Sequence, residues 1–392
     1  MESDKFITVC DGSGLSIVDL SNRNSVKKMP MSAEAAIMNP VTNVLALRGT
    51  DARIALGGGG GHVIDDSTRL SFTTLSDGKV LQIYDRELNA KMKSHTMTSQ
   101  VVYWRWTSPT NIGLVTPTSV FHWSVDVHSY EPAKVFDRKA TLADGQIINY
   151  QVSDDGKWCL LMGIAAGADS VINGTMQLYS IEQKVSQTLQ GHAGCFHTIT
   201  VPGRADPAQV LCFEEKKPDQ PPKLFVMEVG RAKDAAGGVF RLAPQTMPVP
   251  ADAPNDFPVA MLPSKKYDIV YMITKMGYLY LFDIHSGKAL YRARITTDTV
   301  FVMCEQSGTG GVLGITARTG NVLQVTVNEA TLVPYIVSTL RDNVLGIALA
   351  SRLNLPGADE LYLAEVNSHP PPPFPARTLP PPAAAEMRDT LA

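Results

Sequence analysis

The chain has 392 residues, 44% of them hydrophobic, and its 35 basic and 38 acidic residues give a net charge of −3. Such an apolar content excludes disorder throughout, and the length allows two or three domains or one large all-β array. The near balance of charge excludes a basic surface for nucleic acid or an anionic membrane.

Short β-like runs bounded by turn signals recur along most of the chain. In chain order they are Lys5–Cys10, Gly14–Leu20, Val44–Leu47, Val80–Tyr84, Val101–Trp106, Asn111–Thr116, Ser119–Val125, Gln146–Val152, Lys157–Gly163, Met176–Ile181, Gln209–Phe213, Lys223–Val229, Asp268–Thr274, Gly277–Asp283, Val300–Glu305, Val312–Thr316 and Val322–Val327. They group into blocks that repeat at roughly 45–60 residues, near the period of four-stranded propeller blades. From periodicity alone, a pair of β-sandwiches is the alternative.

Three segments depart from this β pattern. Leu332, Ile336, Leu340, Val344 and Ala348 share a helical spacing and predict one amphipathic helix, which Pro356-Gly357 would end before a second helix begins. Residues 49–77 carry a five-glycine run and predict a flexible insertion, and residues 367–392 are too rich in proline for a core element. The expected domains are therefore a propeller over 1–328, a helical linker over 329–366 and a disordered tail over 367–392.

The sequence offers little support for catalysis or for metal and cofactor binding. The glycine run at Gly57–Gly61 lacks the Lys-Ser/Thr pair with which a phosphate-binding loop ends, and the eight histidines lack metal-ligand spacing. The tryptophans alternate on strands, which is typical of packing in a blade. We expect no enzyme activity, no cofactor and no metal.

Targeting signals and disulfides are also not expected. The first residues, MESDKF, are unlike a secretory signal, and no apolar run reaches the ~20 residues of a membrane span. The scattered cysteines predict buried free thiols in a reducing, cytoplasmic compartment: Cys10, Cys159, Cys195, Cys212 and Cys304.

A dozen collinear strings resemble the amino-terminal domain of clathrin heavy chains. They include SAEAAIMNP, LQIYDRELNAKMKSHTMT, VVYWRW, FHWSV, QIINY, MQLYSIEQKVSQTLQGH, NDFPVAM, ITKMGYLYLFDIHSG and VPYI. The resemblance covers about Met1–Arg48 and Gly78–Leu361, and is weaker over Gly203–Pro250.

The resemblance implies a seven-bladed β-propeller followed by a short α-helical linker, without enzymatic activity. It implies a vesicle-coat component on the cytoplasmic face of coated pits and coated vesicles, which acts in endocytosis and intracellular transport. Its partners would be adaptor proteins, bound through acidic leucine-rich linear motifs, with membrane contact only through them. The alternative function is an unrelated scaffold propeller that organises a stable protein complex, and a catalytic propeller ranks third.

The resemblance also implies a first peptide-binding groove between two blades. Gln82 would hydrogen-bond the peptide backbone, Tyr84 would form an aromatic wall, and Lys91, with Lys93 as a second candidate, would meet the acidic end. Asn89 and Met29 stand where the family carries cations, which predicts weaker capture of acidic ends. The residues assigned to this groove are Met31, Leu45, Val80, Gln82, Tyr84, Asn89 and Lys91.

Two further sites follow from the resemblance. A second groove maps to Trp158, Leu178, Gln183, Gln187 and Leu189, with Gln183 in place of an arginine. A central pocket maps to Gln146, Ile148 and Ile164, and in the family its aromatic wall lies upstream of the position of Met1.

Both ends of the chain depart from the family. The family begins upstream of MESDKF, so we expect an incomplete first or last blade with an unpaired strand edge. Tyr362–Ala392 matches none of the helical leg through which the family trimerises and binds light chains. We interpret the ends as a truncated or frame-shifted reading frame, with a divergent short form as the alternative.

Overall fold

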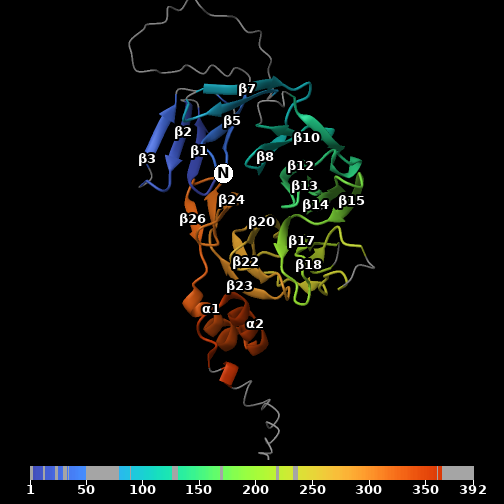
Figure 1. The fold of residues 1–392 in the computed structure, drawn as a ribbon, viewed down its shortest axis with the longest axis vertical. Coiled ribbons are helices and arrows are strands. Elements are labelled where there is room, and N and C mark those ends of the chain that lie inside the picture. The colour runs from blue at the N-terminus through green and yellow to red at the C-terminus, as the bar shows by residue number, and fades with distance from the viewer. Residues whose placement is uncertain are drawn as a thin grey trace, which may run out of the picture. The chain divides into compact units, whose positions relative to one another are not determined.

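Seven antiparallel sheets are arranged side by side around a common axis in the computed structural model (Figure 1). The structure describes residues 3–11, 14–22, 25–29, 33, 35–49, 79–88, 90–125, 131–167, 171–217, 220–232, 237–359 and 361–363. The chain divides between Val327 and Asn328 into two compact units, the first of which holds all seven sheets. This confirms the seven-bladed propeller predicted from the sequence.

Each sheet is one blade, and its strands follow one another in the chain. Blade 1 has β1 (Phe6–Asp11), β2 (Gly14–Asp19) and β3 (Ser25–Met29), and blade 2 has β4 (Ala35–Met38), β5 (Val44–Gly49), β6 (Val80–Asp85) and β7 (Ala90–Thr96). Blade 3 has β8 (Tyr103–Ser108), β9 (Asn111–Val115), β10 (Ser119–Ser124) and β11 (Ala133–Asp137), and blade 4 has β12 (Gln146–Val152), β13 (Trp158–Ala166), β14 (Ile172–Ser180) and β15 (Val185–Gln190). Blade 5 has β16 (Gly194–Ile199), β17 (Ala208–Glu215), β18 (Lys223–Glu228) and β19 (Gln245–Thr246), and blade 6 has β20 (Pro258–Ser264), β21 (Ile269–Thr274), β22 (Tyr278–Asp283) and β23 (Ala289–Arg294). Blade 7 has β24 (Val300–Gln306), β25 (Gly311–Thr316) and β26 (Val322–Val325).

The core of the propeller consists of separate apolar clusters between successive blades, and the helices after Val327 have a cluster of their own. Because side chains alternate along a strand, one face of a blade packs on the preceding blade and the other on the following blade. Leu45, Leu47 and Tyr84 of blade 2 pack on Leu15 and Ile17 of blade 1. The opposite face of blade 2 packs on the tryptophans of blade 3.

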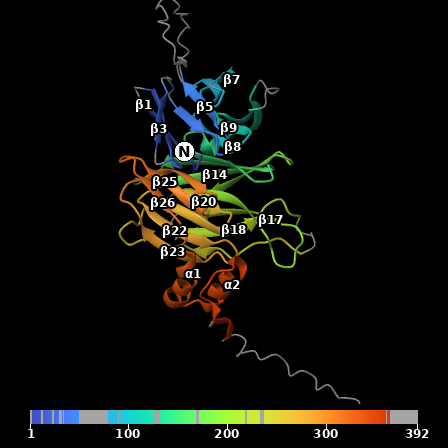
Figure 2. The same cartoon turned by 60° about the vertical axis from the view of Figure 1, so that its left-hand side comes forward.

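Blades 1 and 7 lie next to each other in both views (Figures 1 and 2). The Sγ atom of Cys304 donates to the backbone oxygen of Ser3 at 3.4 Å, and the Ser307 hydroxyl donates to Asp4 at 3.2 Å. In the part of the chain that the structure describes, both blades have three strands. Residues near the start of the chain therefore contact its last blade.

Every run that the sequence predicted as β-like contains or overlaps a strand, but several strands were missed. The outer strands β3 and β7 carry mostly exposed polar residues, SVKKM and AKMKSHT, so they lack the apolar alternation on which the prediction depended. Residues 50–78 and 364–392 lie outside the described residues, so the predicted insertion lies almost wholly and the predicted tail entirely outside them.

The single amphipathic helix predicted from Leu332 onward is wrong. Helix α1 (Glu329–Tyr335) runs into a π-helical turn (Ile336–Leu340), which ends at Arg341 with a left-handed φ of 55°. Asp342 then caps a new helix, α2 (Asn343–Leu353), through a 3.0 Å hydrogen bond from the Leu345 backbone N–H to its carboxylate. The break changes the buried face, so that Val344, which was expected in the apolar stripe, is 77% exposed.

All five cysteines lie among the described residues, where none forms a disulfide bond, and all except the half-buried Cys10 are buried. Burial raises the pKa of the Cys159 thiol to about 12, so this group stays protonated. Among the described residues no helix is long and apolar enough to cross a membrane.

Candidate peptide-binding surfaces

The first predicted groove lies where blade 1 faces blade 2. Leu45 and Tyr84 are 0% and 1% exposed and belong to the apolar cluster between the two blades. Val80 is half-buried on the same face of β6 as Gln82 and Tyr84, because alternate residues of a strand share a face. Met31 and Asn89 lie outside the described residues.

Gln82 is the polar group of this surface. It is 8% exposed and lies opposite Leu47 of β5, a member of the cluster between blades 1 and 2, so its side chain points toward blade 1. Within the described part of the chain its Oε1 atom is buried and has no hydrogen-bond donor. A buried amide oxygen without a donor is costly, and a peptide N–H would satisfy it.

Lysines stand on both sides of this surface. Lys27 of β3 is paired in register with Ile17, and Lys91 of β7 with Tyr84. Directly paired residues of an antiparallel sheet share a face, so Lys27 points toward blade 2 and Lys91 toward blade 1. Both side chains are exposed.

Lys93 and Lys28, on the same two strands, point away from this surface. Lys93 is paired with Ile83 on the other face of blade 2, and its Nζ atom lies 5.6 Å from the ring centre of Trp123 in blade 3. Lys28 lies between Lys27 and Met29 on β3 and points away from blade 2. Met29 itself packs on the apolar cluster between blades 1 and 2. Sequence reasoning missed Lys27 because β3 was not predicted.

The second predicted groove lies over the junction of blades 4 and 5. Trp158, Leu178 and Leu189 belong to or pack on the apolar cluster between these blades, and Gln187 is paired with Leu178 on the same face. Gln183 lies in the turn between β14 and β15, where its backbone N–H donates to the Ser180 hydroxyl at 3.2 Å. Trp158 and Gln183 both line a pocket of about 410 Å³.

Blade 5 contributes the other wall of this pocket, which the sequence did not predict. Arg204 donates two hydrogen bonds to the Glu228 carboxylate, at 2.8 and 2.7 Å, and a third to Asp206 at 3.1 Å. Arg231 donates to Asp206 at 2.5 Å. These residues fall in Gly203–Pro250, where the resemblance is weak, which is why the string matches gave no signal.

The central pocket residues lie together on the inner strands. Gln146 and Ile164 are paired across β12 and β13, and both line, with Ile148, a cavity of about 450 Å³ at the axis of the ring. Strands β8, β20 and β24 complete its wall. Arg48 and Arg105 also line it, and the guanidinium of Arg105 donates to the Asn149 side chain at 2.6 Å. Both arginines were absent from the sequence prediction.

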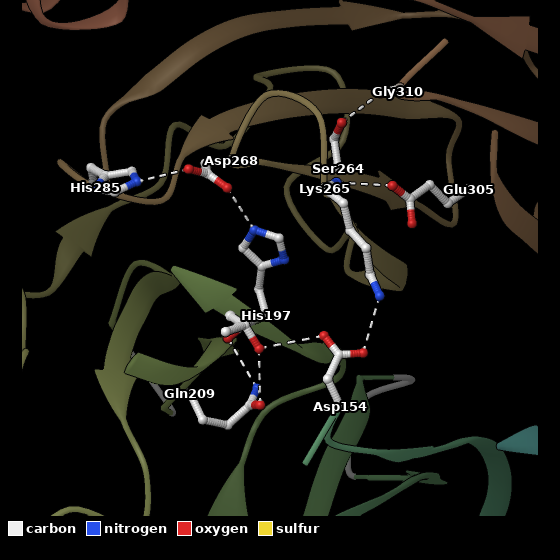
Figure 3. Close-up of polar contacts among 10 residues, drawn as sticks. Asp154, His197, Gln209, Ser264, Lys265, Asp268, His285, Glu305 and Gly310 are labelled. Carbon is white, nitrogen blue, oxygen red and sulfur yellow. Dashed lines mark hydrogen bonds and ion pairs between the residues drawn. The ribbon is translucent and has the colours of Figure 1, made fainter. Parts of the chain in front are cut away.

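Two histidines form hydrogen bonds with one carboxylate at the junction of blades 5 and 6. Asp268 accepts hydrogen bonds from His197 and His285, at 2.8 and 3.0 Å (Figure 3). Elsewhere His122 contacts the Tyr150 hydroxyl at 2.7 Å, and burial lowers its pKa to about 4. In the described ranges no three His, Cys, Asp or Glu side chains form a group that could hold a metal ion.

Sequence comparison identifies the relatives of this propeller. A model described as the clathrin propeller repeat matches residues 250–284. The chain is 42% identical over 372 residues to a probable clathrin heavy chain 1 of Caenorhabditis elegans, and 39% identical over 371 residues to the clathrin heavy chain of Drosophila melanogaster. Each match covers 94% of this chain and 20% of the relative. The chain is a homologue of the amino-terminal region of clathrin heavy chains.

This homology confirms the resemblance found in the sequence. The human clathrin heavy chain 2 gives the same pattern, with 38% identity over 94% of this chain. The chain therefore spans about a fifth of the length of these curated clathrin heavy chains. An unrelated scaffold propeller is no longer the alternative.

Similarity to solved structures supports the fold but not the function. A chain in a crystal structure of the mitotic checkpoint complex gives a TM-score of 0.51 at 10% identity, over 83% of this chain and 89% of that one. The β-propeller domain of Cps50 from Myceliophteria thermophila gives 0.50 at 9% identity, over 84% and 95%. At such identities, these neighbours indicate only a propeller.

Proposed function

We propose that this chain is the motif-binding part of a clathrin coat component. Its propeller captures short linear motifs of adaptor proteins at the cytoplasmic face of coated pits and vesicles, in endocytosis and intracellular transport. Homology to clathrin heavy chains over 94% of the chain supports this role. Trimerisation and light-chain binding, which the resemblance assigns to a helical leg, are not proposed for this segment.

The observation that carries the proposal is Gln82. Its Oε1 atom is buried on the face of blade 2 that packs on blade 1 and lacks a donor among the described residues. An extended peptide that lies between β3 and β7 presents backbone N–H groups at every second residue toward one wall, and one of these would donate to Gln82. The bound peptide would remove the cost of the unsatisfied oxygen.

The lysines on the two walls select an acidic motif. Lys27 and Lys91 are exposed, point toward the same junction of blades 1 and 2, and have no ion pair with any residue that the structure describes. An acidic side chain of the peptide would lie between them. Lys27 and Lys91 thus supply positive charge, although Met29 and Asn89 stand where the resemblance leads us to expect cations.

A peptide that covers a single surface of this kind buries little area, so each site binds weakly. Several motifs on one adaptor, or several propellers in one coat, raise the effective concentration and give avidity.

Fluorescence anisotropy with a labelled peptide of alternating leucines and an acidic end tests the proposal. Gln82→Met keeps the side-chain volume but removes the amide, and should lower the affinity roughly three- to tenfold, the value of one hydrogen bond. Gln190→Met, at an exposed position on β15, is the control and should bind like the wild type. No binding by the wild type, or equal binding by Gln82→Met, would overturn the proposal.

A further inference from the structure

The pocket between blades 4 and 5 has an excess of carboxylates. Six charged residues line it, four acidic and two basic: Asp155, Glu182, Asp206, Glu228, Lys157 and Arg231. A neutral amide, Gln183, occupies the position where the resemblance leads us to expect an arginine. Arg204 lies behind this lining and bonds Glu228 and Asp206, so four carboxylates still outnumber three cations. The local charge is negative, opposite to that of the surface between blades 1 and 2.

Both cations of the pocket already have carboxylate partners within the chain. Lys157 Nζ lies 2.8 Å from Glu182 Oε1, and Arg231 lies 2.5 Å from Asp206. The hydrogen bond to Glu182 raises the pKa of Lys157. An acidic peptide would have to displace one of these carboxylates to reach a positive charge.

The carboxylates of blade 5 stay ionised. Hydrogen bonds from Arg231 and Arg204 lower the pKa of Asp206. Burial alone would raise the pKa of Glu228, but the hydrogen bonds from Arg204 and from the Phe240 backbone N–H outweigh burial and leave this pKa lowered. The negative charges of this wall persist at neutral pH.

One carboxylate remains available to a ligand. Asp155, in the exposed turn between β12 and β13, accepts hydrogen bonds from the Ser153 hydroxyl and the Lys157 backbone N–H. Asp155 interacts electrostatically with Lys157, but among the residues that the structure describes it forms no salt bridge, since the Lys157 ammonium lies against Glu182. A positively charged ligand group would therefore find an acceptor at the blade 4 side of the pocket.

Trp158 adds an aromatic surface next to these charges. It is half-buried, whereas the other three tryptophans, Trp104, Trp106 and Trp123, are buried. Gly230, with a left-handed φ of 84°, brings the backbone against the indole, where a Cβ atom would lie 3.1 Å from its Nε1 atom. An indole face attracts ammonium and guanidinium groups as well as apolar side chains.

We propose that the pocket between blades 4 and 5 binds an apolar linear motif that carries lysine or arginine, and disfavours the acidic motifs taken between blades 1 and 2. The inference rests on the proposed function, since it names the ligand class of a second motif-binding site on the same propeller. The two sites would let one propeller hold motifs of opposite charge at the same time.

The test uses the whole chain labelled with 5-fluorotryptophan and followed by fluorine NMR. Trp158→Phe assigns the Trp158 resonance, which reports on this pocket alone. Three peptides share one leucine-rich core and end in Lys-Arg, Asn-Gln or Asp-Glu. We expect the basic peptide to shift the Trp158 resonance at a concentration at least tenfold lower than the acidic peptide, with the neutral peptide between them.

Gln183→Arg restores the missing arginine and should improve the affinity of the acidic peptide at Trp158 by about threefold or more, while it weakens the basic one. Gln190→Arg adds the same charge to an exposed position of β15 that pairs with Thr175 on the other face of blade 4, and should leave both affinities unchanged.

Stronger binding of the acidic peptide at Trp158, or no shift of this resonance by any peptide, would overturn the inference. The proposed function is judged separately, by the dependence of acidic-peptide binding on Gln82. It stands if that dependence is found even when the inference fails.

Discussion

At the scale of single residues, His192 and Glu214 form a buried pair next to the turn that joins blades 4 and 5. They are 3% and 0% exposed, and His192 Nδ1 lies 3.2 Å from Glu214 Oε2. The other ring nitrogen lies 2.8 Å from the Ile172 carbonyl oxygen, to which it must donate. Nδ1 therefore faces the Glu214 carboxyl group directly. Gly191 precedes the pair because a Cβ atom there would lie 1.8 Å from the Glu214 carbonyl oxygen.

His192→Ala should lower the free energy of unfolding by about 3–5 kcal/mol, because it removes the side-chain partner of a buried carboxyl group and leaves only the backbone N–H of residue 192 as donor. Urea unfolding measures the loss. The double variant His192→Ala/Glu214→Gln removes the buried charge and should recover part of it. A loss below about 1 kcal/mol in the single variant would show that the pair is not a determinant of stability.

Asp268 makes a pH-dependent contribution to the free energy of unfolding. Burial would raise its pKa, but hydrogen bonds from His197 and His285 outweigh burial and leave the pKa well below the ordinary carboxyl value (Figure 3). A carboxyl whose pKa is lower in the folded state stabilises the fold fully above its unfolded pKa of about 3.9, and loses this contribution as the pH falls toward the folded value.

Asp268→Asn should therefore cost about 1.5–3 kcal/mol of unfolding free energy at neutral pH, the value of hydrogen bonds to a charged group, and less near pH 3. Chemical denaturation at the two pH values measures this difference. Asp154→Asn, which removes an exposed pair with Lys265, is the control and should cost under about 1 kcal/mol. An equal cost of Asp268→Asn at both pH values would refute the role of its charge.

At the scale of elements, strand β3 decides which charges face the first surface. Lys27→Glu should weaken binding of an acidic leucine-rich peptide roughly five- to tenfold at low salt, because it removes an attraction and adds a repulsion. Lys28→Glu makes the same change on the next residue, which points away from blade 2, and should alter the affinity less than about twofold. Titrations of the two variants measure the difference. If both variants lose affinity equally, net charge rather than the facing side chain is responsible.

The sequence predicted buried strands better than exposed ones. The run WCLLMGI of β13 is buried along most of its length and was predicted, whereas AKMKSHT of β7 faces solvent and was not. The helical break was missed because the left-handed conformation of Arg341 has no signal in the sequence.

The candidate sites, too, were predicted from the sequence only where it carries a local signal. The three central pocket residues were assigned from the resemblance, two of them within the string QIINY, and do lie together in the fold. The direction of Lys27 required the register of β2 and β3, and the blade 5 wall of the second pocket required the fold of a segment that resembles the family only weakly. The peptide-binding roles of all three sites stay predictions.

At the scale of the whole molecule, one ring of blades carries three distinct surfaces. The first presents exposed lysines, the second an excess of carboxylates, and the third is a cavity at the axis. Because the blades are fixed by apolar clusters between them, ligands at separate junctions should bind independently. If the proposed function holds, such a propeller collects several weak motifs rather than one tight partner.

Photo-crosslinking tests the central claim most directly. An acidic leucine-rich peptide with a photoreactive leucine analogue is bound to the chain, and mass spectrometry locates the adducts. Adducts on Ser25–Met29 and Val80–Thr96 that disappear in Gln82→Met are the result expected for a peptide between blades 1 and 2. Adducts that avoid both segments, or that persist unchanged in Gln82→Met, would contradict it.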